Sequence, residues 1–221
     1  ISPAGRIVYE LEGDLWVVGV QFQSTHQHRG NEMQSVPEMG VPKRVTSGPA
    51  WDRQPAWTPD GRTVVFSSDR NGTVDLWSAH LNEDGSVNEL RALTNSSEIE
   101  AEPNVDKDGT IVFVRGSDQI ADLWLRLPDG RESSLTSAPG GELSPVFSSD
   151  GESVAYVAVK GNQRELRVRY LDSGRDELVV ADATVEHPAW SPDGEKLAFA
   201  TRSGKRGVWV TPRDGAYVNL L

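Results

Sequence analysis

The residues best suited to chemistry are carboxylates that recur just upstream of a repeated proline. Each lies three residues before its proline, except in the last copy, where the spacing is two. The carboxylates are Asp52, Glu100, Glu142 and Glu186, and the prolines are Pro55, Pro103, Pro145 and Pro188. Converging carboxylate oxygens suit calcium or the basic end of a peptide. Ordinary loop solvation also explains the pattern, because acidic residues are abundant throughout the chain.

A second candidate site is the pair His26 and His28 with Glu32 nearby, because histidine and carboxylate side chains bind zinc. The flanking segments, QFQST and RGNEMQSVPEMG, are polar, which favours a solvated loop or a recognition loop over a metal site. His80 and His187 lie at repeat positions, and the chain has no Gly-x-Ser-x-Gly motif. The sequence therefore predicts no catalytic residues.

The segment Asp69-Arg70-Asn71-Gly72 alternates oxygen-bearing side chains with glycine, as calcium loops do. A β-turn accounts for the same residues without an ion. We therefore predict a turn here and no required cofactor, with calcium as the one candidate ion.

These carboxylates and prolines belong to a sequence motif that occurs four times in the chain. The copies are QPAWTPDGRTVVF at 54–66, EPNVDKDGTIVF at 102–113, SPVFSSDGESVAY at 144–156 and HPAWSPDGEKLAF at 187–199, and SPAGRIVY at 2–9 repeats only the second half. The glycines of the copies, Gly5, Gly61, Gly109, Gly151 and Gly194, are 56, 48, 42 and 43 residues apart. Periods in the forties predict one four-stranded propeller blade per repeat.

Each part of the motif has a place in such a blade. The proline opens the first strand, Asp-Gly supplies the positive φ of a hairpin turn, and an apolar strand follows. Large side chains between the proline and the turn are expected to pack at the junction between blades, and these are Trp57, Val105, Phe147 and Trp190. A Leu-Trp pair marks the third strand in most repeats, but the repeat with the copy at 144–156 has Leu166-Arg167.

We therefore predict an all-β fold, a β-propeller of about five four-stranded blades in a single domain over residues 1–221. The approximate blades are 1–50, 51–97, 98–141, 142–184 and 185–221, with an inserted loop at 21–43 and an incomplete first blade that lacks its opening strand. A β-sandwich or barrel lacks this fixed order of residues, and a parallel β-solenoid is the remaining alternative.

The amino-acid composition excludes some classes of binding partner. The formal charge of −11 opposes binding to nucleic acid and to anionic lipid, and we predict neither. No apolar stretch reaches the roughly 20 residues of a membrane helix, so no membrane insertion is expected. The absence of cysteine excludes disulfides and leaves the redox compartment open.

The repeat resembles the TolB-like (WD40-like PD40) propeller repeat, in which a proline is followed by an aromatic residue, Ser-Pro-Asp-Gly and an apolar strand. HPAWSPDGEKLAF at 187–199 is similar almost letter for letter. The resemblance implies three hosts: periplasmic TolB, the propeller of prolyl-oligopeptidase-type serine peptidases, and propellers attached to amidohydrolases. The stretches GRIVYELEGDLWVV and KRVTSGPAWDRQPAWTPDGRTVVFSSDRNGTVDLW look most like the third group.

From this resemblance we expect a non-catalytic module that mediates protein, peptide or interdomain binding, as a section of a larger hydrolase such as an amidohydrolase. The alternatives are a free-standing periplasmic TolB-like interaction protein and a calcium-dependent propeller hydrolase. The resemblance implies a bacterial periplasmic or secreted location. In a propeller the four carboxylates would meet at one mouth of the channel. TolB-like propellers usually have six blades, so ring closure needs missing residues, a second chain in a homodimer, or a compact five-bladed ring.

Overall fold

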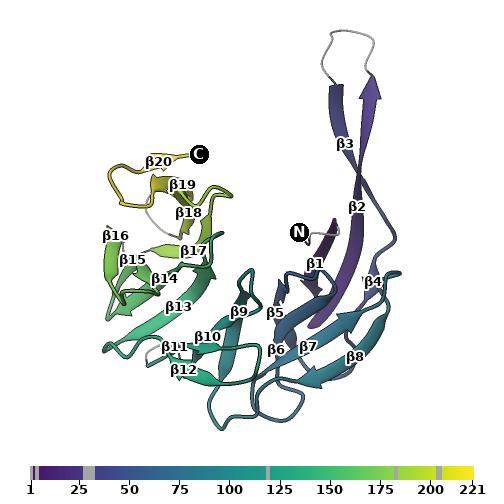
Figure 1. The fold of residues 1–221 in the computed structure, drawn as a ribbon, viewed down its shortest axis with the longest axis horizontal. Helices are drawn as coiled ribbons and strands as arrows, with labels where there is room; N and C mark the ends of the chain where they lie inside the picture. Colours follow the sequence, from purple (N-terminus) through teal and green to yellow (C-terminus); the bar gives the residue numbers. More distant parts are fainter. Residues whose placement is uncertain (1, 3–4, 27–32, 118–119, 182–183, 203–205) are drawn as a thin grey trace.

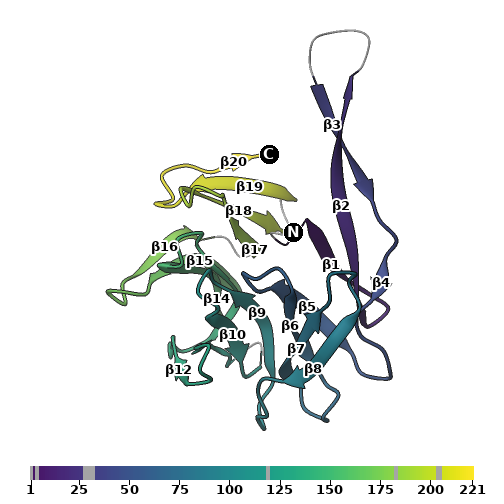
Figure 2. The same cartoon turned by 45° about the vertical axis from the view of Figure 1, so that its right-hand side comes forward.

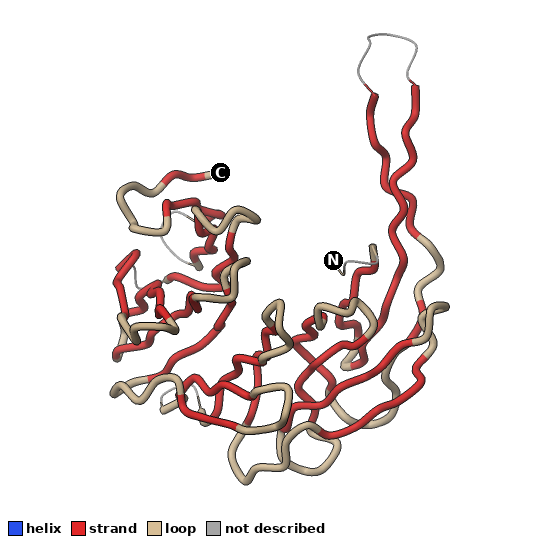
Figure 3. The backbone as a smooth tube through the Cα atoms, viewed as in Figure 1, coloured by secondary structure: helices blue, strands red, loops and turns tan. Residues whose placement is uncertain are grey.

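The computed structural model describes residues 2, 5–26, 33–117, 120–181, 184–202 and 206–221. Every element of regular structure in these ranges is a β-strand (Figure 3), and the strands form five antiparallel sheets. The sheets follow one another in chain order around an open ring (Figure 1), with no extensive contact between the described strands of the last and first sheets, and this arrangement confirms the predicted all-β propeller. No helix in the described part of the chain is long and apolar enough to cross a membrane.

Blades 2 to 5 are four-stranded meanders in which each strand pairs with the next one along the chain. Blade 2 contains β5 (Asp52–Trp57), β6 (Thr63–Ser68), β7 (Asp75–Leu81) and β8 (Val87–Ala92), and blade 3 contains β9 (Glu100–Val105), β10 (Ile111–Arg115), β11 (Asp122–Arg126) and β12 (Glu132–Ser134). Blade 4 contains β13 (Gly141–Phe147), β14 (Ser153–Lys160), β15 (Gln163–Tyr170) and β16 (Asp176–Ala181), and blade 5 contains β17 (Val185–Trp190), β18 (Lys196–Thr201), β19 (Gly207–Pro212) and β20 (Asn219–Leu220).

Blade 1 has a different arrangement. Its strands are β1 (Arg6–Leu11), β2 (Asp14–His26), β3 (Met33–Met39) and β4 (Lys43–Arg44). The first of these follows Gly5 as β6 follows Gly61, so β1 corresponds to the second strand of the other blades, and the described part of this sheet has no counterpart of their first strand.

The segment predicted as an inserted loop at 21–43 is largely a β-hairpin. Strand β2 pairs near its start with β4 and farther along with β3, whose Met39 lies opposite Val20. The long strands β2 and β3 project from the ring as an arm (Figures 1 and 2). These strands were not predicted because the segment is polar and lacks the alternation of apolar and polar residues that indicates a strand.

The core is divided among the junctions, where each blade packs on the next. In the described part of the chain there are four apolar clusters, one for each pair of consecutive blades. The predicted junction residues take part as expected: Phe147 is a member of one cluster, and Trp57, Val105 and Trp190 pack against the others. Extensive contacts between described strands of different sheets all join consecutive blades. Stability of the ring is therefore supplied junction by junction.

The Asp-Gly turns can be tested at Gly109, between β9 and β10. Gly109 has φ of +86°, and an added Cβ would meet Pro128 Cγ at an ordinary 3.6 Å, so only the backbone conformation opposes a side chain. We expect Gly109→Ala to lower the free energy of unfolding by about 1 kcal/mol in urea denaturation. Gly19→Ala is the matched control, because Gly19 has open space around it and no positive φ. Equal stability of the two variants would contradict the assigned turn.

Candidate binding site

The four carboxylates predicted to form a rim are buried at the junctions instead. Asp52 and Glu100 are 0% exposed, Glu142 is 2% exposed and Glu186 is 7% exposed. Three of them make the same backbone bond to the preceding blade: the amides of Asp52, Glu100 and Glu142 each donate at 2.8 Å, to the carbonyls of Gly13, Val74 and Ala121. This bond holds the start of the first strand against the start of the third strand of the neighbouring blade. A ligand-binding role for these four residues stays a prediction.

A threonine from the preceding blade completes each of these contacts. The side chains of Thr46, Thr94 and Thr136 accept hydrogen bonds from the amides of Leu15, Leu76 and Leu123 at 2.8–2.9 Å. At the junction of blades 3 and 4, Thr136 Oγ1 also donates to Glu142 Oε2 at 2.9 Å. The threonine thus ties its own sheet and can bind the carboxylate of the next.

An arginine neutralises three of the four carboxylates. Arg70 Nη2 lies 2.6 Å from Asp52 Oδ1, and Arg115 Nε donates to Glu100 Oε1 at 2.6 Å. Glu186 pairs with Arg202 and, at 3.2 Å, with Arg164. Because a buried charge is costly without a counter-ion, each pair offsets part of the cost of burying its carboxylate.

Aromatic rings hold two of these arginines in place. The guanidinium of Arg70 lies 4.8 Å from the ring centre of Trp77 and 5.8 Å from that of Phe66. That of Arg115 lies 4.0 Å from Trp124 and 5.3 Å from Phe113. The repeated aromatic residues of the second and third strands therefore bind cations as well as packing the core.

Glu142 differs from the other three carboxylates because no ion pair to it occurs among the described residues. Opposite it on β14 lies Ala158, whereas Arg115 lies opposite Glu100. Burial raises the pKa of Glu142 to about 7, and the nearby carboxylates of Asp122 and Asp176 add to this effect while Thr136 opposes it. Glu142 is therefore a buried carboxylate that ionises near neutral pH.

The channel of the ring is lined by the residues just before the repeated prolines. Gln54, Glu102, Ser144 and His187 all have positive φ, between 47° and 54°, at a register shift in the first strand. These residues, with their prolines, Asn104 and Val146, surround a cavity of about 280 Å³. Strained residues of this kind can mark a functional site. Here they recur in all four blades that have a first strand, so they are a feature of the repeat.

A hydrogen-bonded relay joins these channel side chains from blade to blade. Gln54 Oε1 accepts from the amide of Glu102 at 3.1 Å, and the carboxylate of Glu102 accepts from the amide of Ser144. Asn104 Oδ1 likewise accepts from the amide of Phe147 at 2.9 Å. The polar groups at this depth are therefore occupied largely in holding neighbouring blades together.

A second cavity, of about 260 Å³, lies between blades 2 and 3 at the end of the blades where the first strands begin. Trp51 and Ile99, the residues just before β5 and β9, line it, and both side chains are about half exposed. Arg53 lies over the Trp51 ring at 4.5 Å, and the Trp51 amide donates to Asp69 Oδ1 at 2.8 Å. The cavity thus combines exposed apolar surface with an available guanidinium.

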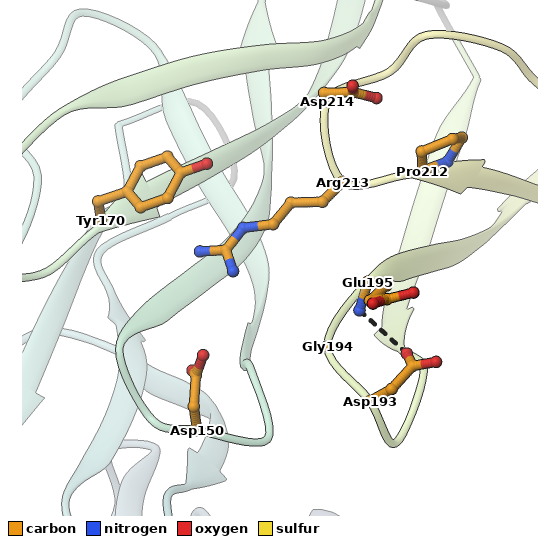
Figure 4. Close-up of a pocket in the computed structure, with 8 residues that line it drawn as sticks. All are labelled: Asp150, Tyr170, Asp193, Gly194, Glu195, Pro212, Arg213 and Asp214. Atoms are coloured by element: carbon orange, nitrogen blue, oxygen red, sulfur yellow. Dashed lines mark hydrogen bonds between the residues drawn. The ribbon is translucent and has the colours of Figure 1, made fainter.

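A cavity of about 410 Å³ is at the opposite end of blades 4 and 5 (Figure 4). Arg213 extends through it toward Tyr170, with its guanidinium 4.7 Å from that ring, and donates to Ser153. Asp150 and Asp193 line the cavity, but each also caps its own hairpin turn. The Arg213 side chain of blade 5 therefore occupies this cavity, where it contacts Tyr170 and Ser153 of blade 4.

The metal candidates are not supported by the described geometry. No group of three or more histidine, aspartate or glutamate side chains among the described residues could hold a metal ion. His28 and Glu32 of the histidine motif lie outside the described residues, as does the His26 side chain. Asp69 to Gly72 forms the predicted turn, with the Gly72 amide donating to the Asp69 carbonyl at 2.8 Å.

Two sets of residues that line cavities were not predicted from the sequence. The channel residues, Gln54 and its counterparts, could have been found from their fixed place before each proline. Trp51 carries no such signal, because its counterparts at the same place, Ile99, Gly141 and Val185, are unlike it. Its importance follows only from its exposure beside a cavity.

Known proteins similar to this chain share its fold. The Tol-Pal system protein TolB of Bordetella pertussis is 33% identical over 152 residues, which is 68% of this chain and 34% of that protein. The crystal structure of TolB from Acinetobacter baumannii superposes with a TM-score of 0.72 at 20% identity, over 93% of this chain and 50% of that chain. An oligogalacturonate lyase in complex with manganese gives a TM-score of 0.61 at 14% identity, over 100% of this chain and 61% of that chain.

These similarities cover only part of the related proteins, and the solved structures show the fold alone. No family model matches the chain. The chain spans about a third of the length of the curated TolB sequence that it matches. The two solved structures are below 25% identity and show the fold.

The buried carboxylate of Glu142 predicts that the free energy of unfolding depends on pH in an unusual way. Between the usual pKa of a glutamate and about 7, folded Glu142 holds a proton that the unfolded chain has released, so its burial destabilises the fold increasingly as pH rises through this window. We expect Glu142→Gln, which keeps the Thr136 hydrogen bond, to raise the free energy of unfolding by about 1–3 kcal/mol above pH 7 and to have little effect below about pH 4.

The matched control is Asp52→Asn, which leaves Arg70 buried without its counter-ion. We expect this variant to lower the free energy of unfolding by about 3 kcal/mol at neutral pH. Urea denaturation across the pH range measures both. Destabilisation by Glu142→Gln at pH 8 equal to that by Asp52→Asn would contradict the assignment of an unpaired Glu142.

Proposed function

Because the chain is a TolB-like β-propeller, we propose that it is a periplasmic module that binds a protein or peptide partner on one face of the ring. The face is the one where the first strands begin, beside the cavity between blades 2 and 3. The relative at 33% identity is a protein of the Tol-Pal system, which supports protein recognition and the periplasmic location. Attachment to an amidohydrolase stays a prediction.

The observation that carries this proposal is the grouping of exposed apolar side chains at that end of the ring. Trp51 is 54% exposed and lines the cavity with Ile99. Leu11, at the turn between β1 and β2, and Ile120, just before β11, add exposed apolar surface at the same ends of their blades. Single exposed apolar residues are ordinary, but a group of them around a cavity is typical of a protein-binding surface.

Trp51 and Arg53 supply the anchors expected of such a surface. Tryptophan and arginine are enriched among the residues that contribute most to binding free energy, especially where they line a pocket. The side chain of Arg53 is exposed and lies over the Trp51 ring, and the hydrogen bond to Asp69 fixes the loop that carries the ring. A partner side chain entering the cavity would therefore meet a preformed wall, which lowers the entropy cost of binding.

Binding to purified Pal of Bordetella pertussis, measured by isothermal titration calorimetry, tests the proposal. We expect association with the wild-type chain and a loss of about 2 kcal/mol, roughly a 30-fold weaker Kd, in Trp51→Ala. Leu178→Ala is the matched control, since Leu178 is also about half exposed but lies on β16. No association of the wild-type chain would overturn TolB-like recognition, and equal effects of the two substitutions would move the binding surface elsewhere.

A further inference from the structure

The junctions of this propeller contain a repeated arginine-binding arrangement. In blades 2 and 3 it consists of the buried carboxylate at the start of the first strand, an aromatic ring on the second strand, and an arginine that contacts both. In blade 5 the carboxylate is Glu186 and the arginine is Arg202. Each of these arginines comes from the end of the second strand or the residues just after it, so the blade supplies its own cation.

Blade 4 keeps two parts of this arrangement and lacks the third. Glu142 is the carboxylate and Tyr156 is the ring, at the position of Phe113 in blade 3. At the position of Arg115, blade 4 has Ala158. Lys160, which follows Ala158 by two residues as Arg202 follows Ala200, is half exposed and pairs instead with Glu165 at 2.9 Å. In the part of blade 4 that the structure describes, no cation forms an ion pair with Glu142.

A cavity of about 260 Å³ occupies the corresponding region of blade 4. Its lining consists of Ala138, Pro139, Glu142, Tyr156, Ala158, Val159, Lys160, Arg167, Arg169 and Asp176. Its lining runs from the start of β13, at the end of the ring where the cavity beside Trp51 lies, to Arg169 and Asp176 on the outer strands. The volume is below the roughly 300–1,000 Å³ of sites for drug-sized molecules and suits a single side chain.

We propose that this cavity binds the guanidinium group of an arginine side chain from a partner peptide, with Glu142 as its counter-ion and Tyr156 as its ring. The proposal rests on the proposed function, because it assigns a binding determinant to the partner that the same face receives. The bound arginine would restore the carboxylate, ring and guanidinium that blades 2 and 3 contain within one chain. A planar guanidinium suits both groups, since it pairs with carboxylates and stacks on aromatic rings.

The charges around the cavity permit a further cation. The ionisable groups that face it or its carboxylate are Asp122 from β11, Tyr156 and Lys160 from β14, Glu165, Arg167 and Arg169 from β15, and Asp176 from β16. Arg167 is already paired with Asp176 at 2.6 Å and with Glu165 at 2.8 Å. With Glu142 ionised, four carboxylates face three cations, so the incoming guanidinium would make the local charge neutral.

Proton and ligand would compete for Glu142. Only the ionised carboxylate pairs with a guanidinium, and burial keeps this carboxyl protonated until near neutral pH. Binding should therefore strengthen as pH rises through 7, whereas a site whose carboxylate is ionised throughout would show no such dependence on pH. Reciprocally, a bound guanidinium should lower the pKa of Glu142.

The test is an NMR titration of the ¹⁵N-labelled chain with N-acetyl-arginine amide, with N-acetyl-citrulline amide as the uncharged isostere. We expect chemical-shift changes confined to blade 4 and the loop before β13 at about pH 8, and an affinity at least about tenfold lower at about pH 5.5. Citrulline amide should give no such changes. Shifts that are equal for the two probes, or scattered over the ring, would overturn the proposal.

Three variants distinguish a loss of arginine binding from a general effect on folding. Glu142→Gln should abolish binding of the arginine probe, and Ala158→Arg should abolish it by placing an arginine where blade 3 has Arg115. Asp52→Asn should retain binding, since its junction already contains an arginine. Survival of binding in either of the first two variants would contradict the proposal. Such a failure would leave the surface beside Trp51 untouched, because Pal binding and the Trp51→Ala variant test that surface separately.

Discussion

The structure depends on a buried carboxylate at each junction between blades and on how its charge is neutralised. The first strand of a blade starts against the third strand of its neighbour, and a carboxylate at that point reaches groups of both sheets. The amide of this residue donates to the preceding blade at three junctions, and its carboxylate pairs with an arginine at three junctions and accepts from Thr136 at the fourth. Such an ion pair contributes little net stability, but removing one partner is costly, so it specifies how the blades meet more than how strongly they hold. The apolar clusters of the same junctions supply the stability.

The binding that we propose involves the places where this repeat is broken. The repeated groups, including the channel residues before each proline, are occupied in joining blades. Two features occur once among the described residues: Trp51 with Arg53 over its ring, and the cavity of blade 4, where no ion pair to Glu142 is found. Each has lining residues at the end of the ring where the first strands begin. A repeat protein can thus keep a uniform fold while single substitutions, such as alanine at 158 or arginine at 167, create a binding site.

Much of the fold could be predicted from sequence because its determinants are local and periodic. The spacing of Gly61, Gly109, Gly151 and Gly194 indicated the blades, and the residues between proline and turn were correctly expected at the junctions. The four carboxylates were found but expected at an open mouth. Counting from the proline assumes regular strand alternation, and the bulge at Gln54 and its counterparts adds a residue that changes which side chains face the channel. Asp52 pairs with Arg70, two residues beyond the cross-strand partner Ser68. The residue at the same offset in blade 4, Lys160, pairs with Glu165 instead of Glu142, and a count from the proline does not reveal this difference.

The measurement that tests this account most directly is the pKa of the Glu142 carboxyl, followed by its ¹³C chemical shift as a function of pH. The account predicts a value of about 7, because the group is buried beside Asp122 and Asp176 without an arginine. It also predicts that the value falls when N-acetyl-arginine amide is added. A pKa near the usual value of a glutamate in the free chain would mean that a counter-ion already neutralises Glu142, and it would contradict both the unpaired junction and the binding site built on it.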